Sequence, residues 1–249
     1  STDPAKKEEI LMARDTNKRS QSEIQLSRHE KLVMLVALTI GMTCSFGIDM
    51  HLPSLPSIVS YFHSTVSLGQ LSVSLYVMSM MVFQLIYGPL SDRIGRKPVI
   101  LLGLFIAVIG SAVCITAQSM AVFLLGRVIQ GMGGAVGLGL GRSLINDVFS
   151  QEKMIRYGSY VSIVLSLGLL IAPTIGGYSQ SLLGWRGTFC VMGAFFIVSI
   201  VMVALLLTET ADMGDHRGQP LVKMLKDYGY LLKQRPFLVY SLCTGLGLG

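Results

Sequence analysis

The eleven residues Gly88-Pro-Leu-Ser-Asp-Arg-Ile-Gly-Arg-Lys-Pro98 separate two long apolar runs, 68–87 and 99–117. If both runs cross a membrane, this stretch has to reverse the direction of the chain. Gly95 can adopt a turn conformation that a residue with a Cβ avoids, and Gly88 allows neighbouring helices to approach closely. The stretch is therefore predicted to be a tight loop between two membrane helices.

The charges in this loop indicate the side of the membrane on which it lies. Short loops rich in Lys and Arg remain on the cytoplasmic side, and this loop carries Arg93, Arg96 and Lys97. Asp92 lies among these cations but does not contribute to that preference, so we expect it to have a specific partner. The alternative is a charged loop that does no more than fix the topology.

The composition is that of a membrane protein. Of the 249 residues, 51% are apolar and 14% are charged, with a mean hydropathy of +0.61, whereas an ordinary soluble domain is about 25% charged. About 20 apolar residues cover the hydrocarbon core of a bilayer. Six apolar runs suit this length: 32–58, 68–90, 99–117, 120–148, 155–183 and 189–207. The predicted fold class is an all-α membrane protein, a six-helix transmembrane bundle with the start of a seventh helix.

Lys and Arg are distributed unevenly between the loops. Seven precede the first run, three lie in the 88–98 loop, two follow the fourth run and five lie between residues 217 and 235, whereas the alternate loops hold only Arg186. This asymmetry places the N-terminus and the basic loops in the cytoplasm. The net charge of +6 therefore reflects membrane topology, and no single basic face points to nucleic acid.

The runs and the polar segments divide the chain into four parts. Residues 1–30 are predicted to be a polar cytoplasmic tail, and residues 31–208 a six-span bundle. Residues 209–236 are predicted to be a cytoplasmic linker, in which apolar residues and lysines alternate at the spacing of an amphipathic helix on the membrane surface. Residues 237–249 begin the seventh span.

No pattern in the sequence argues for an enzyme, a metal site or a bound cofactor. The four cysteines fall inside predicted spans without a CxxC pair, and the four histidines are scattered. A nucleophile elbow, a Walker loop and a zinc motif are all missing from the sequence.

Asp49 is the most costly residue of the first run. Counted from Leu32 at 1.5 Å per residue, it lies about 26 Å along the helix. If the helix continues through Pro53 with a kink, the carboxyl group lies within the membrane, where an ionisable residue is by default a functional hypothesis. The alternative is that the helix ends near Ile48 and that Asp49 is a solvated cap.

The fourth run carries a guanidinium group at a similar depth. An unpaired Arg127 would be costly in hydrocarbon, so Asp49 is predicted to be its partner. Gln130 follows one turn later, and the glycines after it allow close helix contact. The alternative is that Arg127 extends outward to the membrane surface. At the other end of this run, Asp147 should emerge into the cytoplasm near Arg93 or Arg96.

The fifth run combines a proline with small residues. The proline removes a helix hydrogen bond, and the small side chains permit a bend against a neighbouring helix. These residues are Gly168, Ala172, Pro173, Gly176 and Gly177. In addition, Gly88 and Gly95 have the same spacing as Gly177 and Gly184, as three-plus-three inverted repeats predict.

Three of these patterns resemble signatures of the major facilitator superfamily. Gly88, Asp92, Arg93, Gly95, Arg96 and Lys97 match its cytoplasmic loop signature GxxxDRxGRK. Arg127, Gln130, Gly131 and Ala135 match RxxQGxxxA. The fifth run resembles the antiporter motif GxxxGPxxGG, with Ala172 in place of the central glycine. Together with 49–56 in the first run, they look like the N-terminal half of a twelve-span drug–proton antiporter of the bicyclomycin and chloramphenicol resistance type.

The resemblance implies proton-driven export of small lipophilic compounds across a bacterial inner membrane by alternating access. The energy source would be the proton gradient, and a second six-span half is expected after Gly249. Asp49 would carry the proton, with its proton affinity set by burial and by pairing with Arg127. Asp92, Arg96 and Asp147 would form a cytoplasmic latch that holds one state closed.

Two other functions remain open. The altered fifth-run motif leaves room for a substrate–proton symporter of the same fold, which would work in the direction of uptake. A six-span half that binds a partner and transports nothing belongs to a different class. The direction of transport in vesicles distinguishes the first alternative, and six more spans with a matching loop after Gly249 would settle the class.

Overall fold

The computed structural model describes residues 26–209, in which all the regular secondary structure is helical. The predicted amphipathic linker helix and the seventh span lie outside the described residues. The elements are α2 (Arg28–Asp49), η1 (Leu52–Ser54), α3 (Leu55–Tyr61), α4 (Val66–Ile94), α5 (Arg96–Thr116), α6 (Met120–Gly134), α7 (Val136–Val148) and α8 (Gln151–Leu206).

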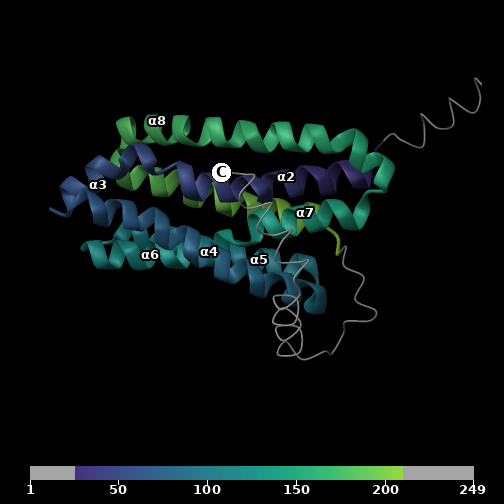
Figure 1. The fold of residues 1–249 in the computed structure, drawn as a ribbon, viewed down its shortest axis with the longest axis horizontal. Coiled ribbons are helices and arrows are strands. Elements are labelled where there is room, and N and C mark those ends of the chain that lie inside the picture. Colours follow the sequence, from purple (N-terminus) through teal and green to yellow (C-terminus); the bar gives the residue numbers. More distant parts are fainter. Residues whose placement is uncertain (1–25, 210–249) are drawn as a thin grey trace, which may run out of the picture.

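Five of the helical stretches are long and apolar enough to cross a membrane. The last of them, α8, has 56 residues, about 84 Å of helix at 1.5 Å per residue and far more than one crossing needs. Its backbone leaves the helical conformation at Gly184, with φ 71° and ψ 179°. Figure 1 shows that α8 folds back on itself near its middle, so the described residues make six passes, as predicted.

The helices lie side by side and define two ends of the bundle (Figure 1). We call the end that holds Arg93, Arg96 and Lys97 the basic end, and the end that holds Gly184 the distal end. At the basic end, α2 begins with a capping box: the Ser27 hydroxyl accepts from the Glu30 N–H, and the Glu30 carboxylate accepts from the Ser27 N–H at 2.7 Å.

The first pass continues beyond Asp49, as predicted for a helix that passes through Pro53. The regular α-helix ends at Asp49, a short 3₁₀ turn forms η1, and α3 then extends the pass to Tyr61. Tyr61 lies twelve residues beyond Asp49, or roughly 18 Å of helix. The carboxyl group is therefore inside the bundle and is not a cap at the end of the pass.

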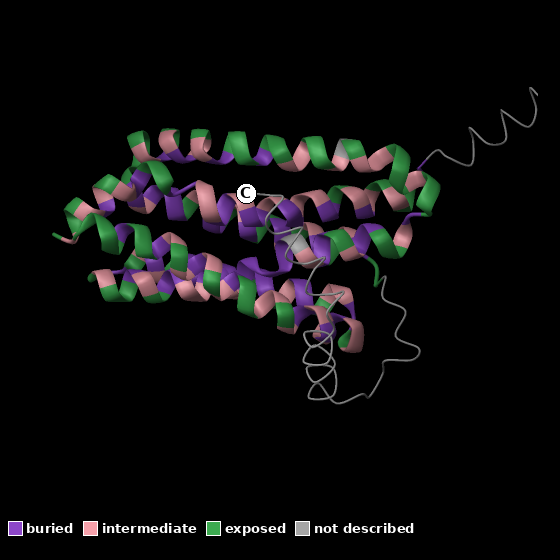
Figure 2. Ribbon diagram, in the orientation of Figure 1, coloured by how far each residue is buried: buried purple, intermediate pink, exposed green. Residues whose placement is uncertain are grey.

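Buried residues face the centre of the bundle and exposed apolar residues face outward (Figure 2). α5 packs on α6 and α8, α2 packs on α7 and α8, and α4 packs on α6. The exposed side chains include Met78 and Leu85 on α4 and Ile155 and Leu182 on α8. An outward apolar surface is what a helix bundle in lipid presents, because the acyl chains solvate it.

The chain reverses its direction after the second pass and after the fifth pass, and in both places the turn contains a glycine with positive φ. Gly95 joins α4 to α5 with φ 102°, and Gly184 divides α8 with φ 71°. Among the described glycines these are the two with positive φ. One lies at the basic end and the other at the distal end, between the second and third passes of each trio. This agrees with the predicted three-plus-three inverted repeat.

Candidate functional site

Arg127 lies in the interior of the bundle with no exposed surface. Its guanidinium donates to the Gly47 carbonyl at 2.9 Å, to the Ser72 carbonyl at 3.5 Å and to the side-chain oxygen of Gln130. Its Cζ atom also lies 4.5 Å from the centroid of the Tyr76 ring. The buried cation is therefore held by neutral oxygens and an aromatic face, from α2, α4 and its own helix α6.

Gln130 extends this buried polar cluster to two further passes. Its Nε2 donates to the Ser111 hydroxyl of α5 at 2.8 Å and contacts the Met192 sulfur of α8 at 2.9 Å. Gln130 is itself fully buried. The side chain orients the Arg127 guanidinium and also ties α6 to α5 and α8.

Glycines make room for Tyr76 in this cluster. A Cβ at Gly47 of α2 or at Gly134 of α6 would overlap the Tyr76 hydroxyl, and a Cβ at Gly131 would overlap the Tyr76 backbone. Small residues in these helices were predicted to allow close contact, and here they let α2 and α6 approach Tyr76 of α4. Tyr76 is fully buried, and its hydroxyl has no hydrogen-bond partner among the described residues.

The predicted pair between Asp49 and Arg127 is wrong. The described residues contain no ion pair between these side chains, and the Asp49 Oδ2 atom is buried without a hydrogen-bond partner. The physical reason is the phase of the helix. Gly47 faces Tyr76, and Asp49, two residues later, points about 200° away.

Asp49 shares its face of α2 with Met42 and Ser45, at spacings of seven and four residues. These two side chains are the neighbours of Gly168 on α8. Asp49 thus lies on the face of α2 toward the first part of α8, outside the Arg127 cluster. Its side chain is only half-buried, so one oxygen is enclosed while the residue as a whole remains accessible.

The residue of the first pass that does share the Arg127 cluster is His51. It is fully buried, and its Nε2 lies 3.5 Å from the Ser72 hydroxyl. His51 follows Gly47 by four residues, which is one helical turn on the same face. His51 was not among the predicted site residues, because the four histidines are scattered along the sequence. Its spacing from the glycines of the same run was the available signal.

The predicted latch residues meet at the basic end. The Arg96 guanidinium lies 2.5 Å from Asp92 Oδ1 of α4 and 3.0 Å from Asp147 Oδ2 of α7. It also donates to the Ser91 hydroxyl at 2.5 Å, a contact that the sequence analysis did not include. Arg93 and Arg96 were both predicted as possible partners of Asp147, and Arg96 is the one that binds it. The three charged residues thereby join α4, α5 and α7.

Glu209 caps the start of α5 next to the Arg96 ion pairs. Its carboxylate accepts from the backbone N–H of Arg96 at 2.7 Å and of Lys97 at 3.3 Å. These N–H groups begin α5, where free donors and the helix dipole favour an anion. The Lys97 ammonium donates to the Ala204 carbonyl at 2.9 Å. The sixth pass is thus fastened to the start of the third. The predicted loop over 88–98 is wrong in its length, because Gly88 and Arg93 lie within α4 and only Gly95 between α4 and α5 is non-helical.

The fifth-run motif packs against the end of α2. A Cβ at Gly176 would overlap the Met50 carbonyl, so only a glycine permits this approach next to Asp49 and His51. Ala172 is fully buried, and Pro173 lies within α8. Gly168 is in ordinary contact with Met42, whereas Gly177 faces open space. The motif therefore packs directly on the backbone of Met50, the residue between Asp49 and His51.

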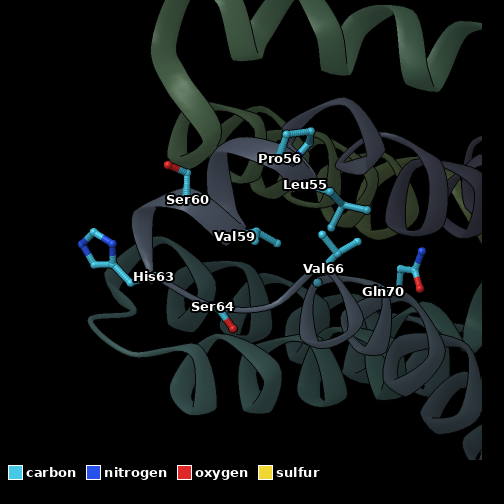
Figure 3. Close-up of a pocket in the computed structure, with 9 residues that line it drawn as sticks. Leu55, Pro56, Val59, Ser60, His63, Ser64, Val66 and Gln70 are labelled. Atoms are coloured by element: carbon cyan, nitrogen blue, oxygen red, sulfur yellow. The ribbon is translucent and has the colours of Figure 1, made fainter.

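A cavity of about 480 Å³ lies at the distal end, between α3 and the start of α4. Figure 3 shows Leu55, Val59 and Val66 around it, with His63 at its edge. None of the predicted coupling or latch residues lines this cavity. Within residues 26–209, no group of His, Cys, Asp or Glu side chains could hold a metal ion.

Comparisons with known proteins agree with this arrangement. The chain is 30% identical over 217 residues to the uncharacterized MFS-type transporter YdgK of Bacillus subtilis, covering 85% of this chain and 54% of that protein. It is 29% identical over 223 residues to a bicyclomycin resistance protein homolog of Haemophilus influenzae, covering 88% and 56%. It is 26% identical over 221 residues to multidrug resistance protein D of Escherichia coli, covering 89% and 55%. The chain spans about half the length of these relatives.

A solved structure has the same fold. The human organic anion transporter MFSD10 (TETRAN) superimposes with a TM-score of 0.62 at 21% identity, over 79% of this chain and 51% of that one. The family model described as Major Facilitator Superfamily matches residues 37–249. Because this model matches most of the chain, the chain belongs to the Major Facilitator Superfamily.

Proposed function

We propose that this chain is the N-terminal half of a proton-coupled exporter of small lipophilic compounds. Protons would enter the cell while the drug-like substrate leaves, and a second six-span half would complete the transporter. The basic end would face the cytoplasm of a bacterial cell, and the protein would lie in the inner membrane. The proton gradient would supply the energy in place of a bound cofactor.

The names of several relatives support export as the direction. One relative is named as a bicyclomycin resistance protein homolog, and others as multidrug resistance proteins. Resistance by transport requires that a compound leave the cytoplasm.

The observation that carries the proposal is the state of Asp49. A carboxyl group lies inside a membrane bundle, with one oxygen enclosed and without a cationic partner among the described residues. An ionisable group at this depth is costly unless it takes part in function. Because no cation neutralises it permanently, the group is free to gain and lose a proton during a transport cycle.

Inverted membrane vesicles that contain the complete protein test this proposal. Chloramphenicol or bicyclomycin added to vesicles with an acidic lumen should release protons, which a pH-sensitive dye reports. Asp49→Asn should abolish this release while the amount of protein in the membrane is unchanged. The matched control is Asp147→Asn, which removes a carboxylate at the basic end and should preserve proton coupling, although it slows transport.

The direction of flux separates export from uptake. If the compound and the proton move the same way across the membrane, the protein is a symporter and the proposal of export is wrong. If no candidate drug drives a proton flux in vesicles with wild-type protein, proton-coupled drug transport is excluded. Unchanged coupling in Asp49→Asn would exclude Asp49 as the proton carrier.

A further inference from the structure

His51 is a titratable side chain that the proposed mechanism does not use. It has no exposed surface, and its ring packs against Phe189 of α8 at a centroid distance of 6.1 Å. Nε2 lies 3.5 Å from the Ser72 hydroxyl. Nδ1 is buried without a hydrogen-bond partner among the described residues. One ring nitrogen is thus poorly satisfied in a buried position.

The charged neighbour of His51 is Arg127. Both side chains contact Ser72, the imidazole at the hydroxyl and the guanidinium at the carbonyl. The other groups that contact the imidazole are uncharged: Ser72 of α4 and Phe189 of α8. Asp49 lies two residues earlier, on the opposite face of α2. The His51 imidazole and the Arg127 guanidinium thus share one neighbour, Ser72.

This arrangement can hold only one positive charge. Two like charges in a buried site repel each other much more strongly than they do in solution. A proton on His51 would therefore be compatible with the cluster only if the Arg127 guanidinium moved away. The bond that would break is the one to the Gly47 carbonyl, at 2.9 Å, which ties α6 to α2.

We propose that His51 is a second protonation site in this half, additional to Asp49, and that its protonation displaces Arg127 from Gly47 and Ser72. The proton adds to the ring nitrogen that is unprotonated in the neutral tautomer, and no other bond forms or breaks. The displacement loosens α6 from α2 and α4. This inference rests on the proposed proton-driven function. It adds a second proton-binding residue, His51, and a side chain, Arg127, that moves when the proton binds.

A nuclear magnetic resonance titration of the 249-residue chain in lipid nanodiscs tests the electrostatic coupling. Ring ¹⁵N signals report the protonation of each histidine, and His51→Gln identifies the His51 signal. Arg127→Gln removes the neighbouring charge, so His51 should take up its proton at a pH higher by about one unit or more than in wild type. The control Arg186→Gln removes a guanidinium at the distal end and should leave the His51 signal unchanged.

An unchanged His51 titration in Arg127→Gln would overturn the inference. Arg127→Lys serves as the second variant if the first does not fold, because it keeps the charge and should preserve the wild-type titration. A Lys variant in which His51 titrates as though the charge were missing would contradict the proposal in the same way.

The predicted displacement is measured separately by spin labels. Leu35 on α2 and Leu125 on α6 are exposed, so labelled cysteines there report the distance between the two helices by electron paramagnetic resonance. Acidification should change this distance in wild type but not in His51→Gln. The matched control His63→Gln, a histidine at the edge of the distal cavity, should respond like wild type. An identical response in His51→Gln and wild type would refute the displacement.

Failure of the proposed function and failure of the role of His51 give different experimental results. If the complete wild-type protein shows no drug-dependent proton flux, the proposed function is wrong, whereas the titration and the distance change would still stand. If flux is present and its pH profile is identical in wild type and His51→Gln, the function stands and the role of His51 is refuted.

Discussion

Arg127 shows how a buried guanidinium can be stabilised without a carboxylate. Carbonyl oxygens of Gly47 and Ser72 and the amide oxygen of Gln130 accept its hydrogen bonds. The Tyr76 ring lies 4.5 Å from its Cζ atom, and a desolvated cation–π contact contributes about 2 kcal/mol. These neutral partners leave the net positive charge of the site in place. A proton or a substrate that enters the cluster therefore meets an uncompensated cation.

Our first residue-scale prediction concerns the energetic independence of Asp49 and Arg127. In a double-mutant cycle of thermal stability, Asp49→Asn and Arg127→Gln should add to within about 0.5 kcal/mol, because the two side chains have no contact or shared partner. As the control, a cycle of Arg127→Gln with Gln130→Ala should show a larger interaction energy, since these side chains are hydrogen-bonded. Strong coupling in the first cycle would mean that Asp49 and Arg127 pair in the membrane.

The sequence predicted which residues would be buried and charged, but not which of them meet. Asp49 and Arg127 lie at similar depths along their helices, and depth can be counted along the chain. Their rotational positions depend on which face of α2 packs on α4 and α6, and many side chains decide this together. The contact between Asp92 and Arg96 was predictable because the two residues are only four positions apart, on either side of Gly95.

At the scale of elements, two glycines with positive φ set the direction of the helices that follow them. The conformations of Gly95 and Gly184 belong to a region that is accessible almost only to glycine and that costs other residues of order 1–3 kcal/mol. Their surroundings differ. A Cβ at Gly95 would overlap the Glu209 carboxylate, whereas a Cβ at Gly184 would meet nothing within 4 Å.

This difference gives an element-scale prediction. Gly184→Ala should destabilise the bundle only by its backbone strain, about 1–3 kcal/mol, whereas Gly95→Ala should cost more because it also displaces Glu209 from the start of α5. Thermal unfolding in detergent measures both variants. Adding Glu209→Ala to Gly95→Ala should recover the steric part of the loss and leave the backbone part. Equal losses in the two glycine variants would show that Glu209 does not fix this loop.

The six passes could be read from the sequence because lipid imposes a length and a composition on each of them. Their internal breaks could not be read in the same way. The α-helix of the first pass ends at Asp49, before Pro53, and the fourth pass is divided at Ala135 into α6 and α7. Such breaks depend on neighbouring helices that satisfy the released backbone groups. Apolar run length carries no information about those neighbours.

At the scale of the whole molecule, a separate set of polar interactions joins the helices at each end of the half-bundle. At the basic end, Arg96 joins three helices, and Lys153 of α8 binds Glu30 of α2 at 2.7 Å. At the distal end, Arg186 donates to the Ile115 and Ala117 carbonyls, at 2.9 and 3.0 Å, where α5 ends. Its guanidinium also lies 4.4 Å from the Trp185 ring centroid. An arginine shortly after a positive-φ glycine thus closes both ends.

The latch supports our last prediction, which concerns turnover in the complete protein. Arg96→Ala and Asp92→Asn should lower the maximal transport rate by about tenfold, which corresponds to about 1.4 kcal/mol, and should leave the KM for the drug nearly unchanged. These side chains lie at the basic end, outside the Arg127 cluster and away from Asp49. Their loss would alter the balance between conformations of the cycle more than the contacts made with a substrate.

Lys153→Ala provides the matched control for this experiment. It breaks an ion pair at the same end of the bundle, between α2 and α8, but it does not touch the Arg96 network. The Asp92 and Asp147 side chains are 38% and 22% exposed, so breaking either pair should change the stability by no more than about 1 kcal/mol. If the latch variants lose drug affinity and retain their rate, or if Lys153→Ala slows transport as much as they do, the Arg96 network does not control the conformational cycle.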